Sequence, residues 1–305
     1  MQIIRCLEDF PSQTKSTVAA IGNFDGIHLG HKKILQFLTK EAKKHKSSSL
    51  VLTFSPHPER YFGKEAIKMI QTLDQRLKEI EKNKIDKTLV LPFSKAIANL
   101  SSRDFIKKIM IDTLRAEVII VGNNFRFGKN RSGNVRILQK LSSLCGYKFF
   151  SIPAEKRNDR IVSSSLIRSL LQKGAVEEAN ALLGHPYVIE GTVIKGHSRG
   201  KRLGFPTANI STDNEIAPHG IYLSYVFLQG QKRPALTNIG TSPTFGLSDT
   251  QIESYLIDFS ENLYGQTQKI HLLKKLRDEI KFSSSDLLID QIKKDLAAAK
   301  TFFKL

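Results

Sequence analysis

The chain has 305 residues, of which 40% are hydrophobic and 25% are charged. This balance is typical of globular proteins and too apolar for a disordered chain. No stretch approaches 18 uninterrupted apolar residues, and the first residues lack the pattern of a secretory signal, so neither a membrane span nor export is expected. Cys6 and Cys145 are isolated and form no metal-binding or redox pair, which predicts a cytoplasmic protein.

The formal net charge is +18, from 47 basic and 29 acidic residues. A field of this sign attracts anions such as nucleotides, nucleic acids or anionic lipids. The lysines are spread along the chain, however, and most fall on the polar faces of expected helices. We therefore expect a solvated basic surface, with no nucleic-acid partner and no membrane partner.

The first half of the chain alternates short β-branched runs with longer helical patterns. Expected strands cover residues 17–22, 49–54, 87–91, 117–122 and 148–152, and helical patterns lie near residues 32–44, 74–83, 103–114 and 135–144. This alternation predicts an α/β domain with a doubly wound parallel sheet. In such sheets, ligands collect beyond the carboxyl ends of the strands.

The second half has dense glycine and proline signals with short extended runs between them. These runs, at residues 187–194, 221–228 and 252–259, predict a small antiparallel β-barrel, followed by a closing helix over residues 285–303. A short helix over residues 175–183 is followed by Gly184. Because glycine commonly ends helices, we place the domain boundary there, giving domains 1–184 and 185–305.

The strongest local signal is the segment GNFDGIHLGH, residues 22–31. It begins where a strand is expected to end and leads into a helix, a place where backbone amides bind phosphate. Gly22 and Gly30 allow close backbone approach. His28 and His31 are three residues apart and share one face of a first helical turn, from which both can donate to phosphate. The alternative is a glycine-rich turn with two incidental histidines.

This segment resembles the His-x-Gly-His motif of nucleotidyltransferases, in the version of bacterial riboflavin kinase/FAD synthetases. Three later stretches are similar to that family in the same order, namely Thr53–Pro58, Val121–Gly128 and Val162–Arg168. By themselves, these stretches are also compatible with a rigid loop, a core turn and a helix N-cap. The family often carries Asp at the position of Asn124 and Thr at that of Ser165.

The resemblance implies adenylyl transfer from ATP to FMN, which yields FAD and pyrophosphate. It implies that His28, His31 and Arg168 are catalytic. The other implied contacts are with ATP, through Gly22, Phe24, Asp25, Gly30, Asn124, Ser163 and Ser164, and with the flavin, through Pro56, His57, Pro58 and Phe127.

The second half contains a glycine-rich stretch, Gly196–Arg202, that does not fit a Walker A motif because its spacing and its last residue differ. Thr207 and Asn209 follow, and in an extended chain they project to one side. Their oxygens suit Mg²⁺, although the stretch by itself equally describes an edge strand with solvated side chains. It resembles the Pro-Thr-Ala-Asn signature of riboflavin kinases.

More of the riboflavin kinase pattern follows in order at residues 218–222, 238–245, 252–259, 263–265 and 276–279. The resemblance implies that Glu253 accepts the proton of the flavin's 5′-hydroxyl; the alternative is a solvated glutamate on an edge strand. The remaining implied contacts are with ATP, through Gly196, Gly200, Lys201, Gly204, Thr207 and Asn209, with Mg²⁺, through Thr207 and Asn209, and with the flavin, through Arg277. Tyr255 and Ser242 stand where the family often has His and Arg.

The ordered set of motifs predicts a bifunctional enzyme that phosphorylates riboflavin to FMN with ATP and Mg²⁺ and then converts FMN to FAD. Its small-molecule partners are then riboflavin, FMN, FAD, ATP, ADP and pyrophosphate. Three alternatives remain: an enzyme with one active half, a nucleotidyltransferase of another specificity, and a nucleic-acid-binding protein that exploits the basic charge. The sequence does not reveal the oligomeric state.

Overall fold

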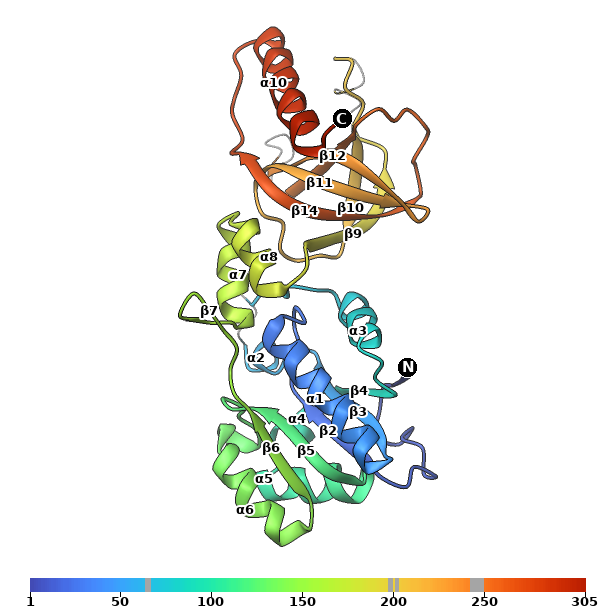
Figure 1. The fold of residues 1–305 in the computed structure, drawn as a ribbon, viewed down its shortest axis with the longest axis vertical. Coiled ribbons are helices and arrows are strands. Elements are labelled where there is room, and N and C mark those ends of the chain that lie inside the picture. Colours follow the sequence, from blue (N-terminus) through green and yellow to red (C-terminus); the bar gives the residue numbers. More distant parts are fainter. Residues whose placement is uncertain (64–66, 197–199, 201–202, 242–249) are drawn as a thin grey trace. The chain divides into compact units, whose positions relative to one another are not determined.

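The structure, a computed structural model, describes residues 1–63, 67–196, 200, 203–241 and 250–305. These residues form two compact units, Met1–Ser164 and Ser165–Leu305. Figure 1 traces the first unit in blue to green and the second in yellow to red. Each unit is described by itself.

The first unit is built on a six-stranded sheet whose neighbouring strands are all parallel. In sheet order, the strands are β1 (Gln2–Ile4), β4 (Lys87–Pro92), β3 (Ser48–Ser55), β2 (Thr17–Ile21), β5 (Ala116–Gly122) and β6 (Lys148–Ile152). The chain leaves β2 toward β3 and later returns to its other side with β5. The switch point of the sheet therefore lies beside β2, where ligands bind in such folds.

Helices cover both faces of this sheet, which confirms the expected doubly wound architecture. The elements outside the sheet are α1 (Leu29–His45), α2 (Pro58–Tyr61), α3 (Leu73–Lys82), α4 (Lys95–Ala98), α5 (Ser102–Asp104), a π-helical segment (Phe105–Thr113), a 3₁₀ turn (Lys129–Arg131), α6 (Val135–Cys145) and the hairpin β7 (Lys156–Arg157) with β8 (Arg160–Ile161). Along β2, Val18 and Ala20 pack with α1, while Ala19 and Ile21 face the π-helical segment and α6.

The second unit is a closed six-stranded barrel, again as expected. Around the barrel, the strands are β10 (Ala208–Thr212), β13 (Thr250–Leu256), β12 (Gln231–Thr241), β11 (Gly220–Leu228), β14 (Thr267–Arg277) and β9 (Tyr187–Ile194). Each strand pairs with its neighbours in antiparallel fashion. The stretch containing Asn209 therefore belongs to an internal strand with partners on both sides, and the edge-strand interpretation of this stretch is wrong. Strand β13 also ends at Leu256, short of the expected residue 259.

Two helices precede the barrel and one follows it. They are α7 (Ser164–Gln172), α8 (Val176–Leu183) and α10 (Ser285–Phe303), the last with the bounds that the sequence predicts. The side chain of Asn180 on α8 donates to the Leu272 carbonyl at 2.8 Å, so α8 is fastened to β14. Helix α10 packs over an apolar patch on the outside of the barrel that includes Leu223 and Leu236.

One ion pair fixes α10 to the end of β14. The Arg277 guanidinium donates to the Asp295 carboxylate through Nε at 3.0 Å and Nη2 at 2.7 Å, and Gln291 donates to the same carboxylate. The two charged side chains are 17% and 7% exposed. A bidentate pair of this kind is held in one geometry, unlike a solvated surface pair.

We expect Asp295→Ala to destabilise the barrel unit by about 3 kcal/mol, because removing one partner leaves the Arg277 charge poorly solvated. The measurement is urea-induced unfolding followed by circular dichroism. Asp290→Ala, an exposed acid on the same helix, is the matched control and should change stability little. Equal effects of the two substitutions would show that the Arg277–Asp295 pair does not hold α10.

Candidate functional site

The first candidate site lies at the carboxyl edge of the parallel sheet. Loops that follow β2, β3 and β5 leave this edge on neighbouring strands, and they carry the predicted motif residues 22–28, 56–58 and 123–128. Because carboxyl ends of parallel strands share one edge, motifs far apart in sequence are brought to one place.

The two predicted histidines form a stacked pair where α1 begins. Their ring centroids lie 3.7 Å apart with an interplanar angle of 16°. His28 is the N-cap of α1, and its Nδ1 accepts a hydrogen bond from the His31 backbone amide at 3.3 Å. Because Nδ1 of His28 accepts this bond, a neutral ring carries its proton on Nε2 and can donate it to a ligand.

Gly30 packs tightly against this stacked pair. A Cβ at Gly30 would lie 3.1 Å from Cε1 and 3.2 Å from Nδ1 of the His28 ring. The preceding loop turns through residues with positive φ, including Phe24 at 51° and Gly26 at 89°. The Phe24 ring lies 5.2 Å from the ring of His31, so the loop folds back over the start of the helix.

Asp25 ties this loop to two others by hydrogen bonds. Its carboxylate accepts from the backbone amides of Ile70 and Gln71 at 3.1–3.3 Å, and it is 1% exposed. Its carbonyl accepts from the Ser164 hydroxyl at 2.8 Å. The buried carboxylate therefore fixes the position of the glycine-rich loop between β2 and α1.

Arg76 is a site residue that sequence reasoning missed. This arginine of α3 is 4% exposed and donates to the carbonyls of Asn23, at 2.8 Å, and Phe54, at 3.2 Å. Burial lowers the pKa of Arg76, and the nearby Asp25 carboxylate opposes that shift. The amide nitrogen of Asn23 in turn lies 2.8 Å from Nε2 of His57. A buried arginine thus braces the ends of β2 and β3, which carry His28 and His57.

The predicted flavin-contacting residues lie at different depths. Ser55–Pro56 is a cis peptide bond, and Pro58 opens α2 beside the 9% exposed His57. Phe127 is 7% exposed and packs in the core, stacked on Phe125 at 5.6 Å. The exposed ring edges of this loop therefore belong to Phe125 more than to Phe127.

The remaining predicted polar residues of the adenylyl-transfer site come from two further segments. Asn124 is exposed in the loop after β5, beside Gly122. Ser163 directly precedes α7, and Ser164 is the first residue of that helix. Arg168 lies one turn along α7 and belongs to the second compact unit.

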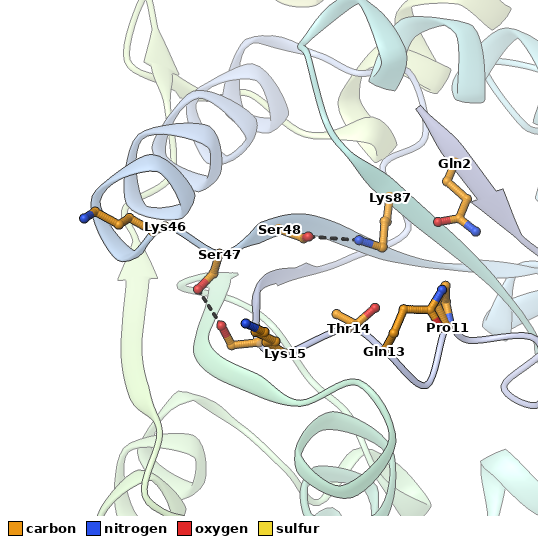
Figure 2. A pocket seen from close by; sticks show the side chains of 10 residues that line it. Gln2, Pro11, Gln13, Thr14, Lys15, Lys46, Ser47, Ser48 and Lys87 are labelled. Carbon is orange, nitrogen blue, oxygen red and sulfur yellow. Dashed lines mark hydrogen bonds between the residues drawn. The ribbon is translucent and has the colours of Figure 1, made fainter.

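A separate polar pocket of about 440 Å³ opens at the opposite, amino edge of the same sheet. Figure 2 shows Lys87 pointing to Ser48, with Nζ 2.9 Å from the Ser48 hydroxyl oxygen. The Ser47 hydroxyl lies 2.7 Å from the hydroxyl of Ser16. The lining residues are Gln2, Pro11, Gln13, Thr14, Lys15, Ser16, Lys46, Ser47, Ser48 and Lys87. The predicted chemistry-bearing residues are absent from this lining, so the pocket is distinct from the candidate site.

The second candidate site is a row of polar side chains across three strands of the barrel. The register places Glu253 of β13 directly between Asn209 of β10 and Asn238 of β12. Their neighbours Ser254 and Thr237 are fully buried and point inward. Because strand residues alternate between faces, the row Asn209–Glu253–Asn238 lies on the outer face of the barrel.

Two glycines lie against the Thr207 and Asn209 side chains. A Cβ at Gly196 would come within 2.2 Å of Nδ2 of Asn209, and one at Gly200 within 3.3 Å of Oγ1 of Thr207. Gly204 has a φ of +86°, which glycine adopts without strain. Lys201, together with Ser242, lies outside the described residues.

The polar row continues to the predicted flavin-binding residue Arg277. Asn238 pairs with Ile221 of β11, and Ile221 pairs with Arg277 of β14. The Arg277 guanidinium is bound to Asp295, so it joins the row to α10. Sequence reasoning did not assign a role to Asn238, although it stands first in one of the motif blocks.

Among the described residues, no three His, Cys, Asp or Glu side chains gather as a metal site. The side chains of Thr207 and Asn209 still fit Mg²⁺ bound with a nucleotide, because they supply hard oxygen donors, and Gly196 and Gly200 let the preceding backbone pack directly against them. Magnesium that accompanies nucleotides usually takes most of its ligands from phosphates and water.

Comparison with known proteins matches each half of the chain to a family. A family model described as FAD synthetase matches residues 10–166, and one described as riboflavin kinase matches residues 183–303. Two full-length relatives are named bifunctional riboflavin kinase/FMN adenylyltransferase. The protein of Buchnera aphidicola from Schizaphis graminum is 36% identical over 100% of both chains, and that of Escherichia coli K12 is 34% identical over 100% of this chain and 99% of its own.

A solved structure shares the whole fold. The crystal structure of a Streptococcus pneumoniae protein named a macrolide-efflux protein has a TM-score of 0.90 and 28% identity, covering 98% of this chain and 99% of that one. In the part of this chain that the structure describes, no helix has the length and apolar character to cross a membrane. The full-length matches and the two domain matches show that the chain belongs to the bifunctional riboflavin kinase/FMN adenylyltransferase family.

Proposed function

We propose that the two activities of this enzyme are divided between the two sites described above, with adenylyl transfer at the carboxyl edge of the sheet and riboflavin phosphorylation on the outer face of the barrel. The functional boundary then lies after Gly184, so that residues 1–184 make FAD and residues 185–305 make FMN. The row Asn209–Glu253–Asn238 carries this proposal for the barrel. The two isolated free cysteines support a cytoplasmic location.

In the proposed adenylyl transfer, a phosphate oxygen of FMN attacks the α-phosphorus of ATP while the bond to pyrophosphate breaks. The chain holds two anions together and stabilises the charge that develops on the α-phosphoryl group. His28 donates from Nε2, because its Nδ1 is occupied by the His31 amide. His31 is stacked on it and donates to the same phosphates. Arg168 supplies a cationic partner for pyrophosphate.

The remaining residues of this half position the substrates. We propose that Gly22, Phe24 and Gly30 shape the nucleotide loop, with Asn124, Ser163 and Ser164 as polar contacts. Asp25 and Phe127 are 1% and 7% exposed, so they support the surface residues of the site by packing and hydrogen bonding more than by direct contact with the substrates. The Pro56–Pro58 turn, braced through His57 and Asn23, places the flavin.

In the proposed kinase reaction, the 5′-oxygen of riboflavin bonds to the γ-phosphorus of ATP, ADP leaves, and the hydroxyl proton passes to the Glu253 carboxylate. Thr207 and Asn209 hold the nucleotide phosphates and Mg²⁺, and Gly196, Gly200, Lys201 and Gly204 form the surrounding loop. When bound, Mg²⁺ neutralises charge on the phosphates. Arg277, which is held in place by Asp295 of α10, contacts the flavin.

A time course with purified protein, riboflavin, ATP and Mg²⁺ tests the assignment of both activities. We expect FMN to appear first and FAD to follow, because the product of the barrel is the substrate of the sheet domain. Accumulation of FMN alone would indicate one active half and would direct attention to Asn124 and Ser165. If FAD fails to form even from supplied FMN, the proposed adenylyl-transfer site is wrong.

We expect His31→Ala to lower FMN adenylylation by about a hundredfold, as loss of a preorganised charge-stabilising donor does, while riboflavin phosphorylation stays unchanged. The readout is chromatographic separation of FMN and FAD, with FMN accumulating. The matched control is His45→Ala, at the other end of the same helix, which should leave both rates intact. Undiminished FAD synthesis in the folded His31→Ala protein would remove His31 from the mechanism.

Thr207→Ala and Asn209→Ala should each reduce Mg²⁺-dependent FMN formation by about a hundredfold, because each removes an oxygen donor to the nucleotide–metal complex. FAD formation from supplied FMN should persist. Ser211→Ala, an exposed hydroxyl on the same strand as Asn209, serves as the control. Loss of both activities in a folded variant would contradict separate sites.

A further inference from the structure

We propose that Asn238 is a specificity-determining residue of the riboflavin kinase site, and that it hydrogen-bonds the hydroxyl next to the one that is phosphorylated. The inference rests on the proposed function of Glu253. It starts from one unusual atom, the side-chain oxygen of Asn238, which is buried and has no hydrogen-bond partner among the described residues. A buried oxygen in this state costs stability, so its retention needs a reason.

The register explains which ligand group reaches this amide. Asn238 stands beside Glu253, and the side chains of directly opposed residues in an antiparallel pair lie about 5 Å apart. A carboxylate accepts hydrogen bonds but cannot donate one, so it does not satisfy the Asn238 oxygen. A hydroxyl of the ligand can donate to this oxygen while its neighbour donates to Glu253.

The surroundings of the row Asn209–Glu253–Asn238 indicate which substrate lies on which side of Glu253. Asn209, on the far side of Glu253, packs against Gly196 and is the proposed ligand of the nucleotide phosphates and Mg²⁺. Beyond Asn238 the row continues with Ile221 and Arg277, next to the apolar patch under α10. The phosphate donor thus occupies the Asn209 side, and the alcohol extends over Asn238 toward Ile221 and Arg277.

Access to the amide requires only a side-chain rotation. Asn238 is half-buried, so part of the side chain already reaches the outer face. A half-turn of the amide exchanges its nitrogen and oxygen, which have nearly the same shape. The nitrogen can then donate to the neighbouring Glu253 carboxylate, and the oxygen can accept from a ligand hydroxyl with no change in strand β12.

The chemical consequence is selection for a polyol chain. Glu253 and Asn238 together offer two adjacent hydrogen-bonding groups, which match two hydroxyls on neighbouring carbon atoms. The ribityl chain of riboflavin carries a 4′-hydroxyl beside the reacting 5′-hydroxyl. A substrate that lacks the 4′-hydroxyl leaves the Asn238 amide without its partner, and sites built to bind a hydroxyl reject such analogues.

The test compares kcat/KM for riboflavin and for 4′-deoxyriboflavin, with ATP and Mg²⁺, in the full chain. We expect the wild-type protein to prefer riboflavin by about tenfold, the contribution of one hydrogen bond. Asn238→Leu and Asn238→Ala should phosphorylate both compounds at similar, lowered efficiency. Gln231→Ala, an exposed amide at the other end of the same strand, should keep the wild-type preference.

The melting temperature is a second readout, which distinguishes a role of Asn238 in substrate specificity from a role in holding the fold. Asn238→Leu removes the unpartnered oxygen and keeps the branched shape of the side chain, so its Tm should equal or exceed that of the wild type. An unchanged substrate preference in Asn238→Leu, or equal use of the two compounds by the wild type, would overturn the inference while leaving the kinase assignment intact. Wild-type protein that phosphorylates neither compound would instead refute the kinase site on which the inference rests.

Discussion

Strand register is the constraint on which both sites depend. In a closed barrel, a shift of one residue would turn every interior side chain outward, so the pairing of β10, β13 and β12 is strongly fixed. That pairing alone sets Glu253 between two asparagines that lie 44 and 15 positions away in the chain. In the parallel sheet, the carboxyl ends of neighbouring strands lie at one edge, and this brings together the loops that carry His28 and His57.

The sites also share a way of achieving rigidity. Several of the proposed site side chains are held by hydrogen bonds or an ion pair to neighbouring groups. His28 is fixed by its own helix, His57 by Asn23, and Arg277 by a buried aspartate. Arg76 adds a charged brace that is almost completely enclosed. Such buried polar contacts preorganise a site because the side chains they hold cannot turn freely.

Much of the fold follows from the sequence. Strands β2 to β6 and the longer helical stretches of the sheet domain are amphipathic or uniformly apolar, and helix α10 has a clear cap and period, so pattern predicts them. Pattern did not predict strand β1, because it has only three residues. It also did not predict strand β14, because lysines interrupt the alternation of apolar residues. Motif residues such as His28 and Thr207 could be found because their spacing resembles a family.

The roles of Arg76 and Asn238 could not be found in this way. In the sequence, Arg76 sits in an ordinary amphipathic helix and reads as a solvated charge; only the packing of α3 against the ends of β2 and β3 buries it. Asn238 interrupts a strand of mixed character, and its partner is 15 residues away. Both depend on contacts between distant segments, which local pattern does not encode.

The buried oxygen of Asn238 affects which substitutions accumulate at this position. Selection for thermal robustness alone, in a laboratory library or in an inverse-folding procedure, would favour an aliphatic residue at this place. Such chains would remain well folded and would gradually lose their ability to choose among alcohols. At position 238, the residue that gives substrate selectivity is therefore less favourable for folding stability than an aliphatic residue would be.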